Sequence, residues 1–280
     1  MTHSAARPAA LSRLVLVAAL VAAAVPARAE QGPATGPDKQ PKRVRGANDK
    51  RRTVRSYGTN LTHNITGVLS KGNREAFFYT AAFTVPARTW DDEVVRFFDQ
   101  HPHKHFGTVG ATMGGTLAIA GVTLGGFAAG RMAYADRFRA ASYDVSQAVI
   151  VTQLYTQALK FAVRRERPDG SNRQSFPSGH ASNAFAVAAV LAHHYGPAVD
   201  IPAFGVASFI ALSRCAANRH FFSDVFAGAG IGWGMGHAVA KRNGRPPDSP
   251  STSNERWRLA LAPDGGPSGD GHGLALHVSF

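Results

Sequence analysis

The sequence predicts an all-α protein, a compact bundle of about six helices. Apolar residues recur at helical spacing through the middle of the chain, and Gly and Pro separate the segments that show this pattern. No run of alternating β-branched residues competes with the helices before the last few residues. A chain of 280 residues can bury one full core. We therefore expect one helical domain over residues 59–240.

The first 29 residues have the pattern of a signal peptide. Arg7 and Arg13 precede the apolar run LVLVAALVAAAV, and the triplet 27–29 ends it as a small-x-small cleavage site. An uncleaved anchor is disfavoured because this run is shorter than the ~20 residues that span a bilayer. The mature chain is expected to start near Glu30. We expect it to be exported, in the periplasm or on the periplasmic face of a bacterial membrane.

Residues 30–58 form a polar segment rich in Gly, Pro, Lys and Arg, with KRVRGANDKRRTVR at its centre. This composition predicts a disordered basic arm. The chain carries a net charge of +13, which indicates anionic partners such as phosphate esters or acidic lipids. The arm is a candidate contact for an anionic membrane surface, and a solvated linker is the alternative. No nucleic-acid partner is expected.

The helical domain begins with two shorter segments. Leu61, Ile65, Val68 and Leu69 predict a first short helix, and TWDDEVVRFFDQ predicts a second with a Thr89 cap and an acidic first turn. The longer segments that follow lie near 107–130, 142–165, 179–195, 201–214 and 221–240.

One stretch is long enough to cross a membrane. Residues 106–130 carry no charge, but Gly, Ala and Thr dominate them. The mean hydropathy of the whole chain is −0.13, which is low for a protein with many membrane spans. Small residues also let helices pack closely in water or in lipid. The sequence thus favours a periplasmic bundle that rests on a membrane over one embedded in it.

The C-terminal segment 241–280 is expected to be an irregular tail. Its last residues, GLALHVSF, alternate weakly and end on Phe280, as the last strands of outer-membrane barrels do, but one candidate strand cannot form a barrel. Cys215 is the only cysteine, which excludes an intramolecular disulfide. We expect it to be a small buried packing residue.

Three short stretches carry residue types suited to chemistry. They are KFAVRRERP, with Lys160, Arg167 and Pro168; FPSGH, with Pro177, Ser178, Gly179 and His180; and SRCAANRHFFSD, with Ser213, Arg214, His220 and Asp224.

The first and third stretches supply cations. A transferring phosphoryl group spreads charge over three oxygens, and fixed positive charge stabilises it. Lys160, Arg167 and Arg214 are the candidates for this role. Each one alone is equally compatible with a solvated basic residue, and that interpretation is kept for Arg164, Arg165 and Arg219.

The second stretch lies just before a predicted helix, ASNAFAVAAVLAHH. Backbone N–H groups and the Ser178 hydroxyl can converge on an anion at the positive end of this helix. Gly179 would let the backbone approach the anion closely. A plain turn with a helix cap describes the same geometry.

His220 and Asp224 suggest a paired imidazole and carboxylate. If the chain is helical from about His220, the two side chains share a face. Asp224 would then accept a hydrogen bond from one ring nitrogen and leave the other free to act. A structural His–Asp pair is the alternative.

Together the stretches resemble the three-part signature of the type 2 phosphatidic acid phosphatase (PAP2) and vanadium haloperoxidase superfamily, with all eleven signature positions present in order. The resemblance implies that His220 attacks phosphorus, forms a phosphohistidine and is oriented by Asp224. It implies that His180 protonates the leaving oxygen and later activates water. The phosphate would be bound by Lys160, Arg167, Ser178, Gly179 and Arg214.

The function implied is a metal-independent phosphatase for phosphate monoesters or diphosphates, including lipid phosphates, in the cell envelope. No cofactor is expected, and vanadate should inhibit as a phosphate mimic. A vanadium-dependent haloperoxidase is the alternative, and a non-enzymatic protein that binds anionic lipid or polyphosphate ranks third. The one metal-like feature, HPHKH with His101, His103 and His105, is expected to be a surface loop without metal.

Overall fold

The computed structural model describes residues 49, 51–67, 71–101, 103–244, 258–264 and 273–279. The predicted signal peptide and most of the predicted basic arm lie outside these residues. The chain divides into two compact units, Met1–Pro247 and Asp248–Phe280. They are described separately below.

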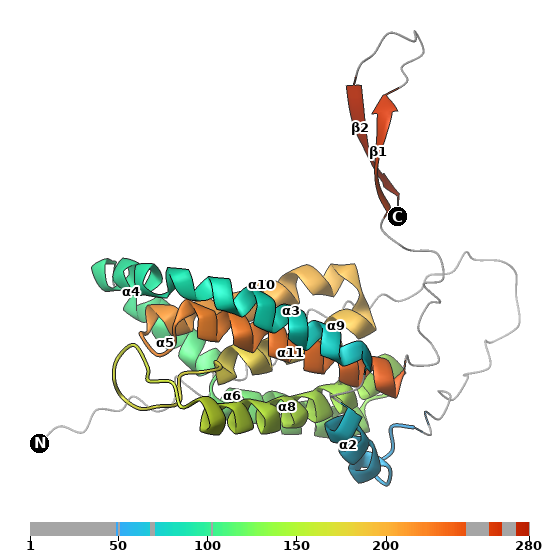
Figure 1. The fold of residues 1–280 in the computed structure, drawn as a ribbon. Coiled ribbons are helices and arrows are strands. Elements are labelled where there is room, and N and C mark those ends of the chain that lie inside the picture. Colours follow the sequence, from blue (N-terminus) through green and yellow to red (C-terminus); the bar gives the residue numbers. More distant parts are fainter. Residues whose placement is uncertain are drawn as a thin grey trace, which may run out of the picture. The chain divides into compact units, whose positions relative to one another are not determined.

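All regular secondary structure among the described residues of the first unit is helical, which confirms the predicted all-α class (Figure 1). Its α-helices are α2 (Tyr57–Thr66), α3 (Lys71–Ala87), α4 (Asp91–Gln100), α5 (Lys104–Met113), α6 (Thr116–Ala120), α7 (Gly126–Met132), α8 (Asp136–Val163), α9 (Gly179–Tyr195), α10 (Pro197–Ala216) and α11 (Phe222–Asn243).

The segment predicted as one helix over 107–130 is interrupted. It comprises α5, α6, a π-helical turn at Gly121–Gly125, and α7. Gly115 adopts an extended conformation with ψ 164°, which ends the first piece and starts α6. The adjacent Gly114 adds further freedom at this point. Apolar periodicity alone cannot reveal such a break because it continues on both sides.

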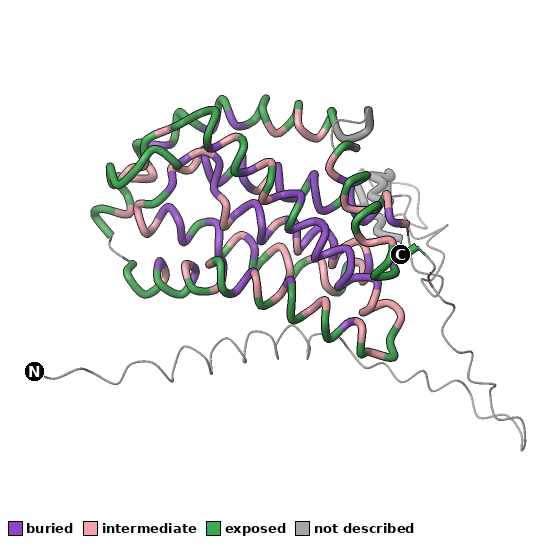
Figure 2. The backbone as a smooth tube through the Cα atoms, turned by 90° about the horizontal axis from the view of Figure 1, so that it is seen from below, coloured by how far each residue is buried: buried purple, intermediate pink, exposed green. Residues whose placement is uncertain are grey.

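The core lies where α9 packs against α8, α10 and α11 (Figure 2). Val149 on α8, Val190 on α9 and Met235 on α11 are each at most 5% exposed and belong to one apolar cluster. Burial of such side chains stabilises the fold by about 1.5–3 kcal/mol each. The central helices therefore hold their ends in fixed positions.

Glycines on α11 bring it unusually close to α9. Gly228, Gly232 and Gly236 recur one turn apart, and at each of them an added Cβ would collide with backbone of α9 or the residue before it. At Gly228 that Cβ would lie 2.5 Å from the carbonyl oxygen of Ser178. The close approach lets Ser178 N donate to the backbone oxygen of Asp224 at 3.0 Å. Helix packing thus joins the second and third sequence motifs.

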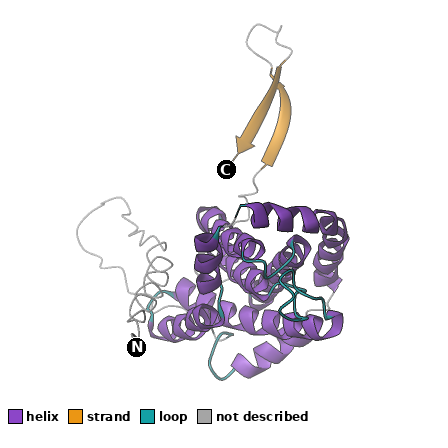
Figure 3. Cartoon of the chain, turned by 90° about the vertical axis from the view of Figure 1, so that its left-hand side faces the viewer, coloured by secondary structure: helices purple, strands orange, loops and turns teal. Residues whose placement is uncertain are grey.

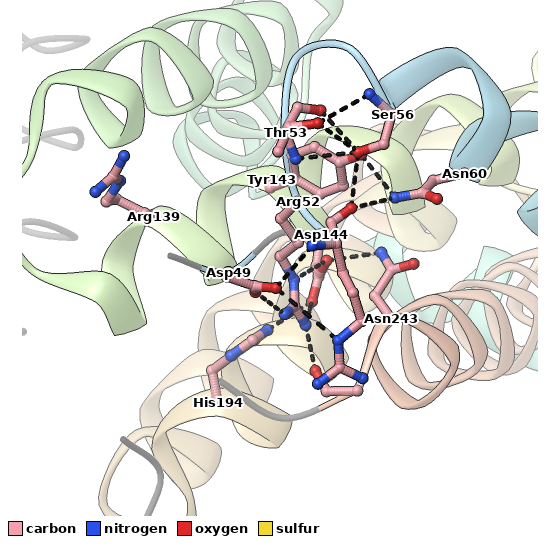
Figure 4. A network of polar contacts seen from close by, with 12 residues as sticks. Asp49, Arg52, Thr53, Ser56, Asn60, Arg139, Tyr143, Asp144, His194 and Asn243 are labelled. Carbon is pink, nitrogen blue, oxygen red and sulfur yellow. Dashed lines mark hydrogen bonds and ion pairs between the residues drawn. The ribbon is translucent and has the colours of Figure 1, made fainter. Parts of the chain in front are cut away.

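A buried polar network lies around Asp144 (Figure 4). Arg52 donates from Nε and Nη2 to the two oxygens of Asp144, at 2.9 Å each. Asn243 Nδ2 lies 2.7 Å from Oδ1 of the same carboxylate, and His194 Nε2 lies 2.8 Å from Oδ2. These contacts join α8, α9 and the end of α11 to the chain that precedes α2.

The position of Arg52 changes the predicted boundary between the basic arm and the helical domain. The prediction that residues 30–58 form a disordered arm is wrong at its C-terminal end, since Arg52 is 3% exposed and α2 already begins at Tyr57. Composition treats a run of basic residues as solvated. A bidentate guanidinium–carboxylate pair instead satisfies this one inside the bundle.

Two helical stretches among the described residues, Lys104–Met132 and Pro197–Ala216, are long and apolar enough to cross a membrane by length and composition alone. The first contains the uncharged stretch noted in the sequence. Leu117 and Leu124 in it, and Ile201 in the second, are exposed. Buried core helices of soluble proteins share this length and composition.

The second unit contains an antiparallel pair of strands, β1 (Arg258–Asp264) and β2 (Gly273–Ser279). The register runs from Arg258 opposite Ser279 to Asp264 opposite Gly273. This corrects the prediction of an irregular tail. Each strand alternates too briefly to be recognised alone, whereas the two together can satisfy each other's backbone groups.

Candidate functional site

The three motifs meet at one end of the bundle. Lys160 lies in the last turn of α8, Ser178 caps the start of α9, and His220 lies two residues before α11. A view along the bundle shows loops lying between the helix ends (Figure 3). The loop 164–178 begins where Arg164 ends α8 in a left-handed conformation, with φ 49°. Pro168 in this loop cannot continue a helix.

The three predicted cations come from different elements. Lys160 is 6% exposed and donates from Nζ to the carbonyl oxygen of Gln174 at 2.6 Å. Arg214 is 6% exposed in the last turn of α10, and Arg167 lies in the loop. Nε and Nη1 of Arg214 and Nε of Arg167 are buried without a hydrogen-bond partner among the described residues. Buried guanidinium donors of this kind are costly unless they meet an anion.

These cations lie near one another and near both histidines, because their mutual repulsion shifts the pKa values of Lys160, His180 and His220. Burial, followed by repulsion from Arg167, lowers the pKa of Lys160 to about 8. Burial, followed by repulsion from Arg214, lowers the pKa of His180 to about 4. Burial, followed by repulsion from Lys160 and Arg167, lowers the pKa of His220 well below its ordinary value. Both imidazoles are therefore neutral at neutral pH.

Ser178 and Gly179 form the start of α9 as predicted. Ser178 Oγ accepts a long hydrogen bond of 3.5 Å from Ala181 N, and Ser178 N is already bound by the Asp224 carbonyl. The remaining anion donors are the hydroxyl and the first-turn amides of Gly179 and His180, which have no partner four residues back in the helix. A Cβ on Gly179 would lie 4.0 Å from Lys160 Cε, so the glycine backbone borders the ammonium group.

The structure differs from two predictions about His220. The helix begins at Phe222, after His220, and the predicted hydrogen bond to Asp224 is absent, since His220 Nδ1 lies 3.9 Å from Asp224 Oδ2. Nδ1 instead donates to the carbonyl oxygen of Ser175 at 2.6 Å. A carbonyl can only accept, so Nδ1 carries the proton and Nε2 carries the lone pair.

Asp224 stabilises the helix start and the loop. Its Oδ2 accepts from Phe221 N at 3.0 Å and from Ser175 Oγ at 2.5 Å. As the third residue of α11 it reaches back to the N–H before the helix, which is why it does not face His220 directly. Asp224 supports His220 through Ser175.

Sequence reasoning missed Arg165, Asp91 and Ser175. Arg165 was interpreted as solvated, and that is wrong, because it donates 2.7 Å hydrogen bonds to Asp224 Oδ1 and Ser223 Oγ. Nothing in the sequence pairs Arg165 with Asp91, which is 74 positions away on α4. Arg219 instead makes a half-exposed pair with Asp169 at 2.9 Å.

No group of three or more His, Cys, Asp or Glu side chains is arranged to hold a metal ion within the described residues. His101, His103 and His105 are exposed, as predicted, and His101 stacks on Phe97. The prediction of a loop is wrong for Lys104 and His105, which already belong to α5. Cys215 is 3% exposed, in agreement with a packing role.

Comparison with known proteins finds similarity over this part of the chain. The family model described as PAP2 superfamily matches residues 143–245. The lipid A 1-phosphatase of Porphyromonas gingivalis is 43% identical over 76 residues, which cover 26% of this chain and 17% of that protein. A PA-phosphatase related-family protein of Dictyostelium discoideum is 29% identical over 127 residues, 35% of this chain and 47% of that protein. The chain thus spans less than half the length of either relative.

Two solved structures align with part of the chain. Aquifex aeolicus LpxE aligns with a TM-score of 0.46 and 24% identity, over 54% of this chain and 94% of that one. The transmembrane PAP2 type phosphatidylglycerolphosphate phosphatase from Bacillus subtilis aligns with a TM-score of 0.45 and 18% identity, over 67% and 94%. All three motifs fall inside the matched range 143–245. The part of the chain that carries the three motifs is thus similar to the PAP2 superfamily.

Proposed function

We propose that this protein is a metal-independent phosphatase that hydrolyses phosphate monoesters or diphosphates, with lipid phosphates as the main class, through a phosphohistidine at His220. The observation that carries the proposal is the group of buried donors on Arg167 and Arg214 that have no hydrogen-bond partner in the part of the chain that the structure describes. Repulsion from both arginines contributes to the lowered pKa of His220, so their guanidinium groups lie near this neutral imidazole, whose Nε2 holds a lone pair.

The first step is attack of His220 Nε2 on phosphorus. An N–P bond forms while the bond from phosphorus to the leaving oxygen breaks, and the leaving oxygen takes a proton. Lys160, Arg167 and Arg214 stabilise charge on the phosphoryl oxygens, together with the first amides of α9.

His180 is the proposed proton donor. In the free protein its pKa is about 4, because burial and Arg214 oppose its positive charge. A bound phosphate dianion offsets the nearby cations and raises this pKa, so that His180 is protonated in the complex. In the first step, protonated His180 transfers this proton to the leaving oxygen.

The second step releases phosphate. Neutral His180 takes a proton from water as the water oxygen attacks phosphorus, and the N–P bond breaks. Free phosphate and His220 with its Nε2 lone pair remain. The side chains named here supply every proton and charge that the two steps require, and neither step uses a metal ion or an organic cofactor.

Lipid phosphates are favoured by two observations. The relative from Porphyromonas gingivalis is named a lipid A 1-phosphatase. Phe222 and Phe226 lie on the first turns of α11 beside His220, and Phe226 is 39% exposed, where it can flank an acyl or prenyl chain. Together with the predicted signal peptide, these features support an activity at the periplasmic face of a membrane, where the basic arm would meet anionic lipid headgroups.

Purified protein dialysed against EDTA should release phosphate from a panel of esters. The panel contains p-nitrophenyl phosphate, phosphatidic acid, a prenyl diphosphate and lipid A, the lipids in mixed micelles. Activity on at least one ester without added metal supports the proposal. Absence of phosphate release from all of them, or release only after a divalent metal is added, overturns it.

A further inference from the structure

Arg165 lies between two buried carboxylates. Its Nη1 is 2.7 Å from Asp224 Oδ1 on α11, and its Nη2 is 2.8 Å from Asp91 Oδ2 on α4. Asp91 is 4% exposed, and Asp224 is fully buried. The two nitrogens of one planar group thus bridge two helix N-termini, a geometry that a lysine ammonium cannot reproduce.

Further contacts fix Arg165 and Asp91 in place. The Arg165 guanidinium lies 4.0 Å from the ring centre of Phe221, the neighbour of His220. Asp91 Oδ1 accepts from Ser223 N at 2.8 Å, and Oδ2 accepts from Ser223 Oγ at 2.7 Å. Asp91 therefore holds both Arg165 and the first turn of α11.

The contacts continue to the imidazole through Ser175. The backbone N of Ser175 donates to the carbonyl oxygen of Arg165 at 2.9 Å. Its hydroxyl donates to Asp224, and its carbonyl accepts from His220 Nδ1. Every polar group of Ser175 is therefore engaged, and Arg165 holds it both directly and through Asp224.

We propose that Arg165 and Asp91 are positioning residues, which hold Asp224 and Ser175 so that His220 keeps its Nδ1 proton and aims Nε2 at phosphorus. This inference rests on the proposed function. Neither side chain touches substrate. Without Arg165, the buried Asp224 loses its only arginine or lysine donor among the described residues, and the loop that carries Ser175 loses its contact with Asp91 on α4 and one of its contacts with α11.

If Arg165 positions His220, its substitution should lower kcat and leave KM nearly unchanged. Arg165→Met should lower kcat by about 100-fold, since a nucleophile misplaced by about 1 Å loses that much. KM for a lipid phosphate should stay close to the wild-type value, because Lys160, Arg167 and Arg214 remain in place. Asp91→Asn should lower kcat less, because the amide keeps its shape and can still accept from Ser223 N.

Arg52→Met is the matched control. It also removes a buried arginine from a buried aspartate, but at the Asp144 network (Figure 4). All variants should be assayed per mole of folded protein, with the thermal midpoint measured in parallel. Arg52→Met should lower the midpoint and keep the wild-type kcat.

Chemical rescue separates positioning from general stability. In Arg165→Ala, added methylguanidine should restore part of kcat by occupying the space between the carboxylates, and it should not activate the wild type. The positioning role is refuted if Arg165→Met turns over at the wild-type rate, or if Arg52→Met loses as much kcat as Arg165→Met does. A wild-type protein that hydrolyses no ester refutes the proposed function itself, whereas an active wild type with an unaffected Arg165→Met refutes the positioning role alone.

Discussion

His220 Nδ1 donates a 2.6 Å hydrogen bond to the carbonyl oxygen of Ser175 and lies 3.9 Å from the carboxylate of Asp224. The imidazole is therefore oriented by the loop 164–178, while Asp224 orients that loop. Because a backbone carbonyl cannot be removed by substitution, the tautomer of His220 depends on where the loop lies. This relationship makes the loop part of the catalytic apparatus in the mechanism proposed above.

Asp224→Asn should impair turnover less than His220→Ala does. The amide can still contact Phe221 N or Arg165, but its nitrogen cannot accept from the donors that surround Asp224, so kcat should fall by about 10- to 100-fold through loss of orientation. His220→Ala removes the nucleophile and should lose several orders of magnitude. Initial rates of phosphate release measure both. Asp169→Asn, which alters the half-exposed pair with Arg219, is the control and should stay near wild type. Equal losses in Asp224→Asn and His220→Ala would contradict the indirect role of Asp224.

The pH profile should report Lys160. Its pKa of about 8 means that the ammonium is charged below that pH and neutral above it. Since kcat/KM reflects the free enzyme, it should fall as pH rises through about 8. Lys160→Arg keeps a positive charge in that range and should remove this alkaline limb. If the Lys160→Arg variant keeps a fall in kcat/KM at the same pH, a group other than Lys160 causes that fall.

Gly228→Ala should destabilise the domain and reduce activity together. The new methyl group would lie 2.5 Å from the Ser178 carbonyl oxygen, so α11 must move away from the start of α9. Overpacking of this kind costs about 1–3 kcal/mol in the free energy of unfolding. Thermal denaturation and phosphate release provide the two readouts. At Gly234, on the same helix, an added Cβ meets only Ala76 Cβ at 3.5 Å, so Gly234→Ala should be tolerated. Similar effects of the two substitutions would contradict the close approach of α11 to α9.

Orthovanadate should inhibit phosphate release competitively, because a trigonal-bipyramidal oxyanion suits the same cations and His220. The vanadate-loaded protein should oxidise bromide with peroxide poorly, since the segment DGSNRQSF between Arg167-Pro168 and Pro177 is too short to enclose a permanent vanadate. Inhibition kinetics and a bromination assay check the two halves. Efficient bromination with no hydrolysis of any phosphate ester would favour the haloperoxidase alternative.

The sequence was sufficient to predict the helical class and the residues of the three motifs. Helical periodicity records the burial of each segment, and spacing within a motif is local, so Ser178 and Gly179 were correctly placed at the start of a helix. The relation of His220 to Asp224 was not predictable, because it depends on whether the helix starts before or after His220. A shift of two residues changed the partner of Nδ1.

Contacts between distant segments could not be predicted from the sequence either. Arg165 with Asp91, and Arg52 with Asp144, are pairs separated by 74 and 92 positions. A basic residue in a charged run has the same local pattern whether it is solvated or buried against a carboxylate. Only the packing of α4 and α8 with the rest of the bundle distinguishes the two cases.

Trapping the phosphoenzyme tests the central claim most directly. Protein mixed with an ester labelled with ³²P in its phosphate should be quenched in base within the first turnover, digested, and mapped by mass spectrometry. We predict a base-stable, acid-labile label on His220, absent from His220→Ala and reduced in rate of formation in Arg165→Met. Rapid hydrolysis by the wild type with no label at any time in the first turnover, or with label on another residue, would contradict the phosphohistidine mechanism.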